Sequence, residues 1–165
     1  AQDISLLAYH LPLDGHERFG NNAVLAQALG AVETEPAFEL AGRPVGLSCR
    51  LPRAEPLEVF VARLTEVLEG REPLVVGAGP GEVERFGVVT GRSPRSVEEA
   101  VERGLDLFIT GEPAEEVVHL AREEGIHFVA AGHHATERFG VRALAEHLES
   151  IFDVETRYFE VPNPV

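Results

Sequence analysis

The fold is predicted by one stretch, residues 105–153, which reads LDLFITGEPAEEVVHLAREEGIHFVAAGHHATERFGVRALAEHLESIFD. Its apolar runs at 105–110 and 126–132 have the length and composition of buried strands, and each is followed by a segment with helical periodicity. With a further strand predicted at 154–161, the order is strand, helix, strand, helix, strand. That alternation favours a largely parallel sheet with helices packed on it.

Patterns outside this stretch predict further strands and helices with a less regular spacing. We expect strands at 3–9, 44–49, 73–77 and 85–91, a loop at 11–20, and helices at 21–30, 56–70 and 96–104. Predicted strands and helices do not alternate regularly between residues 31 and 104. We therefore expect an inserted lobe there, with 1–30 and 105–165 forming the other lobe. The predicted fold class is α/β, with a mixed, largely parallel sheet flanked by helices and an inserted second α/β lobe.

The composition excludes several classes of function. The chain has 165 residues and a formal net charge of −14, so it has no broad basic surface for nucleic acid. Cys49 is the single cysteine, which excludes an intrachain disulfide and a cysteine metal cage. The sequence contains no apolar run of about 18 residues and no basic leader, so we expect no membrane span and a cytoplasmic location.

The motif AGHHATE, residues 131–137, places a histidine and an acid four positions apart. If a helix begins near His133, the side chains of His133 and Glu137 lie on one face near its first turn, where both can bind one metal ion. An alternative is that Glu137 stabilises the helix N-terminus and His133 lies on the surface of a loop. The spacing alone leaves both interpretations open.

A second pair, His10 and Asp14 in YHLPLD, has the same spacing and also follows a predicted strand. Ligands of α/β sheets gather beyond the carboxyl ends of the strands, where Gly111 and Glu112 of FITGE also fall. The presence of two such histidine–acid pairs at predicted strand ends favours a metal site. The mixed nitrogen and oxygen donors suit Zn, Mn, Fe, Co or Ni.

Three other patterns carry weaker signals. The run GAGPGE at 77–82 fails both nucleotide-binding fingerprints and is interpreted as a turn. The loop TGRSP at 90–94 precedes a predicted helix whose N-terminus would accept an anion. Cys49 has no basic neighbour apart from Arg50, which argues against a nucleophile.

Three segments resemble the Nif-three-like dinuclear-metal family, whose members are labelled GTP cyclohydrolase 1 type 2 homologues. They are YHLPLDGHERFGNNAVLAQALG, DLFITGEPAEEVVHLAREEGIHFVAAGHHATERFGVRALAEHL and the closing FEVPNPV. The resemblance implies a two-metal site with Asp14, His133 and Glu137 among its ligands and His10 beside the metals. It also implies two α/β lobes and a ring-shaped homohexamer with its metal sites facing an internal cavity.

The same resemblance implies a further His-His pair upstream of His10. Only nine residues precede His10 here, so we expect the chain to be the C-terminal part of a longer protein. The full-length subunit would hold two divalent ions, whereas the groups present here would hold one at most.

The resemblance implies a metal-dependent hydrolase that acts on a nucleotide-like substrate. His10 and His134 are the candidate catalytic residues for proton transfer. Arginines such as Arg92, Arg95 and Arg138 are candidates for binding the nucleotide. Two alternatives remain: a hexameric metal-binding scaffold or regulatory protein without turnover, and histidine–acid pairs that only satisfy one another structurally.

Overall fold

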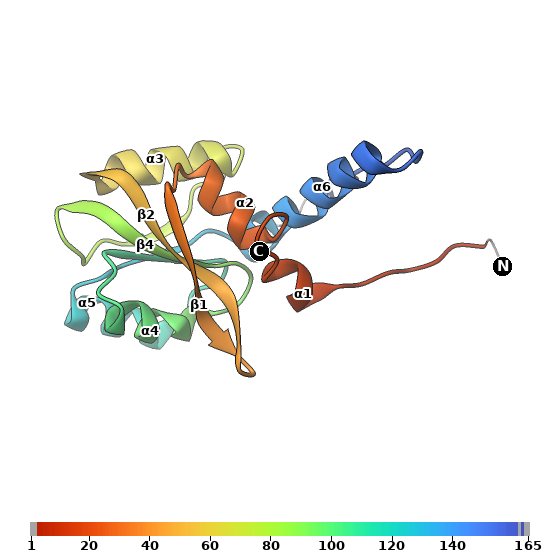
Figure 1. Cartoon of the computed structure of the whole chain (residues 1–165). Helices are drawn as coiled ribbons and strands as arrows, with labels where there is room; N and C mark the ends of the chain where they lie inside the picture. Colours follow the sequence, from red (N-terminus) through yellow and green to blue (C-terminus); the bar gives the residue numbers. More distant parts are fainter. Residues whose placement is uncertain (1–2, 162, 164–165) are drawn as a thin grey trace.

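A computed structural model describes residues 3–161 and 163 of the chain, and within them six strands form one mixed sheet in the order β1-β2-β4-β5-β6-β3 (Figure 1). The strands are β1 (Glu33–Leu40), β2 (Arg43–Pro56), β3 (Leu74–Val76), β4 (Glu82–Val89), β5 (Leu107–Thr110) and β6 (His127–Ala130). The helices are α1 (His10–Asp14), α2 (Asn21–Ala28), α3 (Leu57–Val67), α4 (Val97–Glu102), α5 (Glu115–Glu124) and α6 (His133–Ile151), with a 3-10 turn η1 at Pro94–Ser96.

Helices cover both faces of the sheet because its central strands are apolar on both sides. In β5, Leu107 and Ile109 belong to the core beneath α2 and α3, whereas Phe108 belongs to the core beneath α4 and α5. Side chains alternate between the two faces of a strand, so a run of consecutive apolar residues buries both. The prediction of a mixed α/β sheet flanked by helices is confirmed.

The sheet is less parallel than the sequence predicted. Strands β4, β5 and β6 run parallel, but β1 with β2, β2 with β4 and β3 with β6 pair antiparallel. Strands β1 and β2 are joined by the short turn at Ala41 and Gly42, and so short a connection allows only antiparallel pairing. The strands of residues 31–104 therefore share one sheet with β5 and β6, and the division into lobes stays a prediction.

Two predicted strands and one predicted loop are wrong. Residues 3–9 and 154–161 have no helix or strand, and most of their side chains are exposed. A strand is stable only when a neighbour satisfies its backbone N–H and C=O groups, and none of the described strands lies beside either segment. Residues 11–14, predicted at the start of a loop, form helix α1 together with His10, and Pro12 occupies its first turn, where proline is tolerated.

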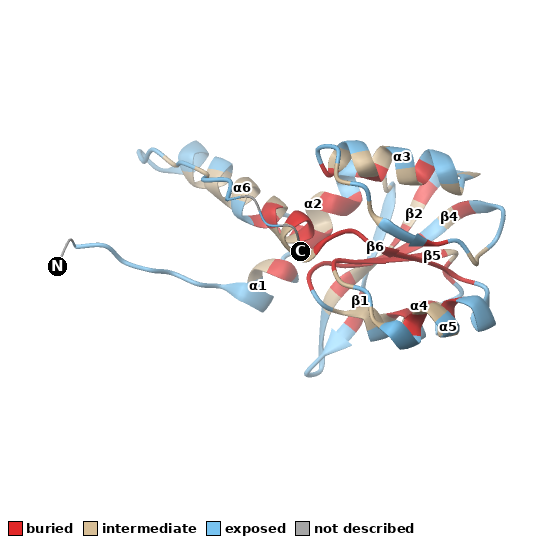
Figure 2. Ribbon diagram, turned by 180° about the vertical axis from the view of Figure 1, so that it is seen from behind, coloured by how far each residue is buried: buried red, intermediate tan, exposed pale blue. Residues whose placement is uncertain are grey.

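The three parallel strands end at one edge of the sheet, and their following residues meet there. β4 leads to Thr90 and Gly91, β5 to Gly111 and Glu112, and β6 to Gly132 at the start of α6. Helix α6 buries residues only in its first two turns and then extends away from the sheet (Figures 1 and 2). Among the described residues, no helix combines the length and apolar character that crossing a membrane requires.

Candidate metal centre

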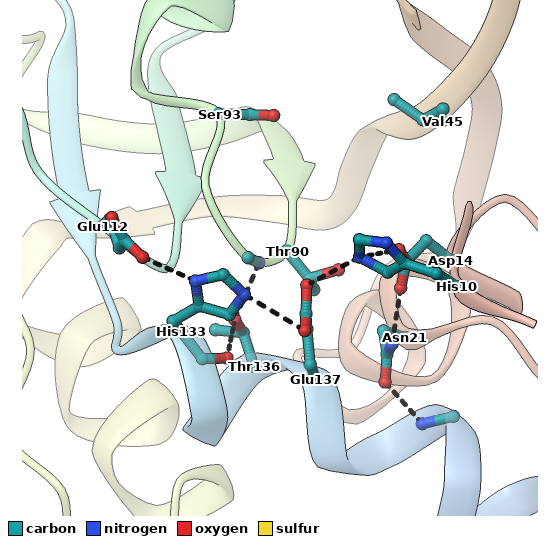
Figure 3. Close-up of polar contacts among 12 residues, drawn as sticks. His10, Asp14, Asn21, Val45, Thr90, Ser93, Glu112, His133, Thr136 and Glu137 are labelled. Atoms are coloured by element: carbon teal, nitrogen blue, oxygen red, sulfur yellow. Dashed lines mark hydrogen bonds and ion pairs between the residues drawn. The ribbon is translucent and has the colours of Figure 1, made fainter. Parts of the chain in front are cut away.

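Two helices bring the two histidine–acid pairs together at this edge of the sheet. On α1, Nε2 of His10 lies 3.6 Å from Oδ2 of Asp14, and the same atom lies 3.9 Å from Oε1 of Glu137 on α6 (Figure 3). On α6, Nε2 of His133 lies 3.2 Å from Oε2 of Glu137. The candidate metal ligands near the two ends of the chain thus surround one small space.

Ligand atoms of three of these residues converge closely enough to bind one ion. One atom each from His10, Asp14 and Glu137 lies within 4.8 Å of the others. These residues and His133 line a cavity of about 180 Å³, whose remaining wall includes Val45 and the loop after β4. The donor set of imidazole nitrogen and carboxylate oxygen suits the borderline divalent metals.

A second carboxylate orients His133. Oε1 of Glu112, which follows β5, lies 2.6 Å from Nδ1 of His133, so Nε2 of the ring faces Glu137 (Figure 3). Burial of the ring lowers the pKa of His133, but the hydrogen bond with Glu112 and the charges of Glu137 and Glu112 outweigh burial and raise it. A carboxylate that holds the far nitrogen of a histidine is the usual arrangement around protein-bound metals.

The carboxylate of Asp14 is buried and held by a buried asparagine. Its side chain is 11% exposed, and Nδ2 of Asn21 donates to Oδ1 of Asp14 at 2.6 Å. Oδ1 of Asn21 accepts the backbone N–H of Gly140 at 2.6 Å, so Asn21 connects α1 to α6. The neighbouring Asn22 donates to the carbonyl oxygens of Asp14 and Val45 and accepts the N–H of Thr90.

Gly91 leaves room for the Glu137 carboxylate. Its φ of +71° lies in the left-handed region, and a Cβ atom built on it would overlap Oε1 of Glu137. The N–H of Gly91 donates to Oγ1 of Thr136 at 3.1 Å, and the Thr136 hydroxyl donates to the carbonyl oxygen of Gly132. The loop after β4 is therefore pinned to the first turn of α6.

The helix-capping interpretation of Glu137 does not describe this geometry. Helix α6 begins at His133 with no side-chain cap, and the carboxylate of Glu137 faces His133 and His10 instead of the free N–H groups of the helix. Two carboxylates, Asp14 and Glu137, approach each other without an arginine between them. Like charges at this distance disfavour each other unless a cation lies between them, so the residues fit a bound metal.

The remaining candidate residues fall in different places. His134 does not line this cavity, and its Nε2 lies 2.7 Å from Oε1 of Glu160. Arg92 lies at the rim, with Nε at 3.4 Å from Oε2 of Glu112. Arg95 does not line this cavity; it pairs with Glu116 and lines a separate hollow beside α4.

The sequence reasoning missed several residues that shape the site. Asn21 and Asn22 were interpreted only as a helix start, although two adjacent asparagines within the motif HLPLDGHERFGNN were a usable signal. Glu112 was noticed at a strand end but not assigned to His133. No sequence signal separated Gly91 from the other loop glycines, because its role depends on how close Glu137 comes.

Comparisons with known proteins point to one family. The family description Duf34/NIF3 (NGG1p interacting factor 3) matches residues 1–164. Proteins of Pseudomonas aeruginosa and Escherichia coli K12, both named GTP cyclohydrolase 1 type 2 homolog, are 46% and 44% identical over 98% and 99% of this chain. The chain spans 64% of the length of each.

Two solved structures are similar to this chain in both fold and sequence. The structure of protein ybgI, described as of unknown function, has a TM-score of 0.88 and 41% identity, with 95% of this chain and 62% of that one covered. The structure of TTHA1606 from Thermus thermophilus has a TM-score of 0.79 and 37% identity, with 94% and 60% covered.

Proposed function

This chain belongs to the Duf34/NIF3 family, and from that premise we propose that it holds divalent metal ions with Asp14, His133 and Glu137. We propose further that the metal centre hydrolyses a small nucleotide-like molecule. The observation that carries the proposal is the convergence of His10, Asp14 and Glu137, whose ligand atoms lie within 4.8 Å of one another.

The number of ions follows from the donors available. Four side chains of this chain, those of His10, Asp14, His133 and Glu137, supply imidazole nitrogens and carboxylate oxygens, which suit Zn, Mn, Fe, Co or Ni. These four side chains suffice for one ion. The upstream His-His pair that the sequence resemblance implies would complete a second, so the proposal is two ions for each full-length subunit.

The chain's own residues have separable roles in the proposed reaction. When bound, the ions supply a Lewis acid that activates water and polarises a carbonyl, imine or phosphoryl group. Asp14, His133 and Glu137 would hold the ions, and the hydrogen bond with Glu112 fixes the orientation of the His133 ring. The His10 side chain is 73% exposed and lies between the carboxylates and solvent, where it can carry a proton in or out.

The substrate class rests on the names of relatives and on the arginines near the site. The proteins from Pseudomonas aeruginosa and Escherichia coli carry the name GTP cyclohydrolase 1 type 2 homolog, which suggests opening of a guanine-type ring by water. Arg92 at the rim of the cavity and Arg138 beside His134 are placed to meet an anionic part of such a molecule.

A non-catalytic role is the second candidate, and one observation favours it. The cavity at the carboxylates has a volume of about 180 Å³, which is below the roughly 300–1,000 Å³ typical of small-molecule sites. A space of that size accommodates ions more readily than a nucleotide. The alternative is therefore a metal-binding scaffold or regulatory protein that performs no turnover.

Self-association is part of either proposal. Large apolar side chains are exposed on residues 3–11, on α6 and after it, including Ile4, Leu6, Leu7, Val141, Ile151, Phe152 and Phe159. Exposed apolar surface on this scale is typical of protein interfaces. We propose a ring-shaped homohexamer with the metal centres facing its interior. Native mass spectrometry of the full-length protein tests this, and a monomer at micromolar concentration would contradict it.

The decisive experiment measures metal and turnover together. Full-length protein is dialysed against chelator, reloaded with Mn²⁺ or Zn²⁺ and incubated with GTP and other nucleotides, and products are followed by chromatography. The Glu137→Gln variant should lose turnover and about 100-fold or more in metal affinity, since it removes a charged ligand. The matched control is Glu146→Gln, an exposed glutamate on the same helix.

The outcomes separate the candidates. Turnover that Glu137→Gln abolishes and Glu146→Gln retains supports the hydrolase. Tight metal binding without turnover of any nucleotide supports the scaffold. Less than one tightly held ion per full-length chain would mean that the histidine–acid pairs only satisfy one another.

A further inference from the structure

The segment after α6 turns back and runs beside the helix (Figure 2). One of its carboxylates, that of Glu160, contacts several donors. Glu160 lies 2.7 Å from Nε2 of His134 and accepts the Tyr158 hydroxyl at 2.7 Å. Nη2 of Arg142 donates to Glu160 at 2.9 Å, and Nη1 of Arg138 lies 3.9 Å away. Four groups therefore converge on one carboxylate, as they would in a binding site for an oxyanion.

The charge of this carboxylate is strongly favoured. Hydrogen bonds from His134 and Tyr158, with the positive charge of Arg138, lower the pKa of Glu160 to about 2. Glu69, in the loop after α3, is the other acid in the cluster, at 2.7 Å from Arg142 and 3.2 Å from Arg138. We refer to His134, Arg138, Arg142 and Tyr158 as the anion cluster.

The carboxylate of Glu160 does not satisfy the anion cluster fully. The Arg138 side chain is 9% exposed, and its Nε and Nη2 atoms are buried without a hydrogen-bond partner among the described residues. A buried N–H group without an acceptor costs free energy comparable to that of a lost hydrogen bond. A carboxylate offers two acceptor oxygens, whereas a phosphate ester offers three with more charge.

Three residues of the anion cluster line the same hollow as His133 and Glu137. The hollow has a volume of about 580 Å³, and His134, Arg138 and Tyr158 are the cluster residues in its wall. That volume lies within the roughly 300–1,000 Å³ range of small-molecule sites, unlike the cavity at the carboxylates. Arg138 and Glu160 also line a second hollow. The wall of this second hollow includes Arg71, whose guanidinium lies against Gly132.

The charge of this region becomes more positive when Glu160 leaves. With Glu160 in place, the carboxylates of Glu160 and Glu69 offset Arg138 and Arg142. Without it, Glu69 alone faces these two arginines, so the three groups together carry a net positive charge. An incoming anion would thus replace the charge that Glu160 now supplies.

From this geometry we infer that the anion cluster is the phosphate subsite of the substrate, and that Glu160 occupies it until a phosphate displaces it. The inference rests on the proposed function for the identity of the ligand, which is a nucleoside phosphate whose base reaches the metal centre. Displacement of Glu160 frees the segment 154–161 from α6. The same hollow then widens toward solvent as the substrate enters.

The first test uses inorganic phosphate and metal-free protein, so that no ion binds the anion. Calorimetry should show phosphate binding that Arg142→Gln weakens about tenfold or more, because it removes a charge-assisted hydrogen bond. Glu160→Gln should strengthen it about tenfold, because the competing charge is gone. Arg95→Gln, the same change at an arginine paired with Glu116 outside the cluster, is the matched control and should have no effect.

A second measurement reports displacement directly. With ring-¹³C-labelled tyrosine, the Tyr158 resonance is identified by its absence in Tyr158→Phe. Saturating phosphate should shift it from its position in the phosphate-free protein, because the Tyr158 hydroxyl then donates to a phosphate oxygen instead of to Glu160. An unchanged Tyr158 resonance at saturating phosphate would overturn the inference, even if phosphate binds elsewhere.

The final test assigns the phosphate to the substrate. Metal-loaded full-length protein should bind guanosine monophosphate at least about tenfold more tightly than guanosine, and Arg142→Gln should remove that preference. Equal affinities would overturn the assignment. Phosphate binding that requires metal and ignores Arg142→Gln would overturn the subsite while leaving the proposed metal centre intact.

Discussion

The carboxylate of Glu112 lies 2.6 Å from Nδ1 of His133 and thereby turns Nε2 of that ring toward Glu137. The two residues follow neighbouring parallel strands, β5 and β6, whose carboxyl ends lie side by side. The strand arrangement therefore brings together His133 and the carboxylate that orients it. This pairing makes Glu112 the most direct test of the proposed metal centre.

We predict that Glu112→Gln weakens metal binding about 10–100-fold and leaves the fold intact. The amide still reaches His133 but no longer supplies a negative charge that makes the ring a stronger donor. Isothermal calorimetry with Mn²⁺ measures the affinity. Glu123→Gln, at an exposed position on α5, is the control. An affinity in Glu112→Gln equal to that of the control would show that His133 is not a ligand.

Gly91→Ala should lose metal binding as well as stability. Its backbone has φ +71°, and the added Cβ would overlap the carboxylate of Glu137. Gly30→Ala is a matched control, because Gly30 has φ +83° with no atom within 4 Å of an added Cβ. Both variants should lose about 1–2 kcal/mol of unfolding free energy from backbone strain. Only Gly91→Ala should lose metal affinity, and equal affinities in the two would contradict the close approach of Glu137.

Asn21→Ala should destabilise the chain by about 1–3 kcal/mol, because it removes the buried hydrogen bonds of Asn21 with the N–H of Gly140 and with Oδ1 of Asp14. Urea unfolding monitored by circular dichroism measures the loss. Gln27→Ala, an exposed position on α2, should change stability by less than about 0.5 kcal/mol. Because Asn21 also positions Asp14, metal binding should weaken in Asn21→Ala and not in Gln27→Ala.

The contacts of Glu160 should be lost only in strong acid. Its pKa is lowered to about 2 in the folded chain from the ordinary 4.5, so the folded state favours the charged form. The contribution to stability is present above pH 4.5 and disappears as the pH falls from there through about 2. The Tyr158 ¹³C resonance should therefore titrate with a midpoint near 2. A midpoint near 4.5, or the same titration in Glu160→Gln, would mean that the contacts do not form.

Much of the fold could be predicted from local patterns, and the errors have a common cause. The strands β5 and β6 and the helices α3, α5 and α6 were predicted because each carries its own apolar run or stripe. The segment VETRYFEV alternates like a strand, yet it pairs with no described strand, and it contacts α6 through Thr156, Tyr158 and Glu160. Pairing requires a neighbour at the right place, which local sequence does not specify.

The sequence by itself determined the apolar periodicity and the spacing of four residues within each histidine–acid pair, because both follow from the geometry of a single helix or strand. The tertiary structure decided that Asp14 and Glu137 meet in one cavity, that Glu112 holds His133, and that Glu160 binds the arginines of α6. These contacts join segments distant in the chain. They form only when the sheet aligns its strand ends, so no local pattern reveals them.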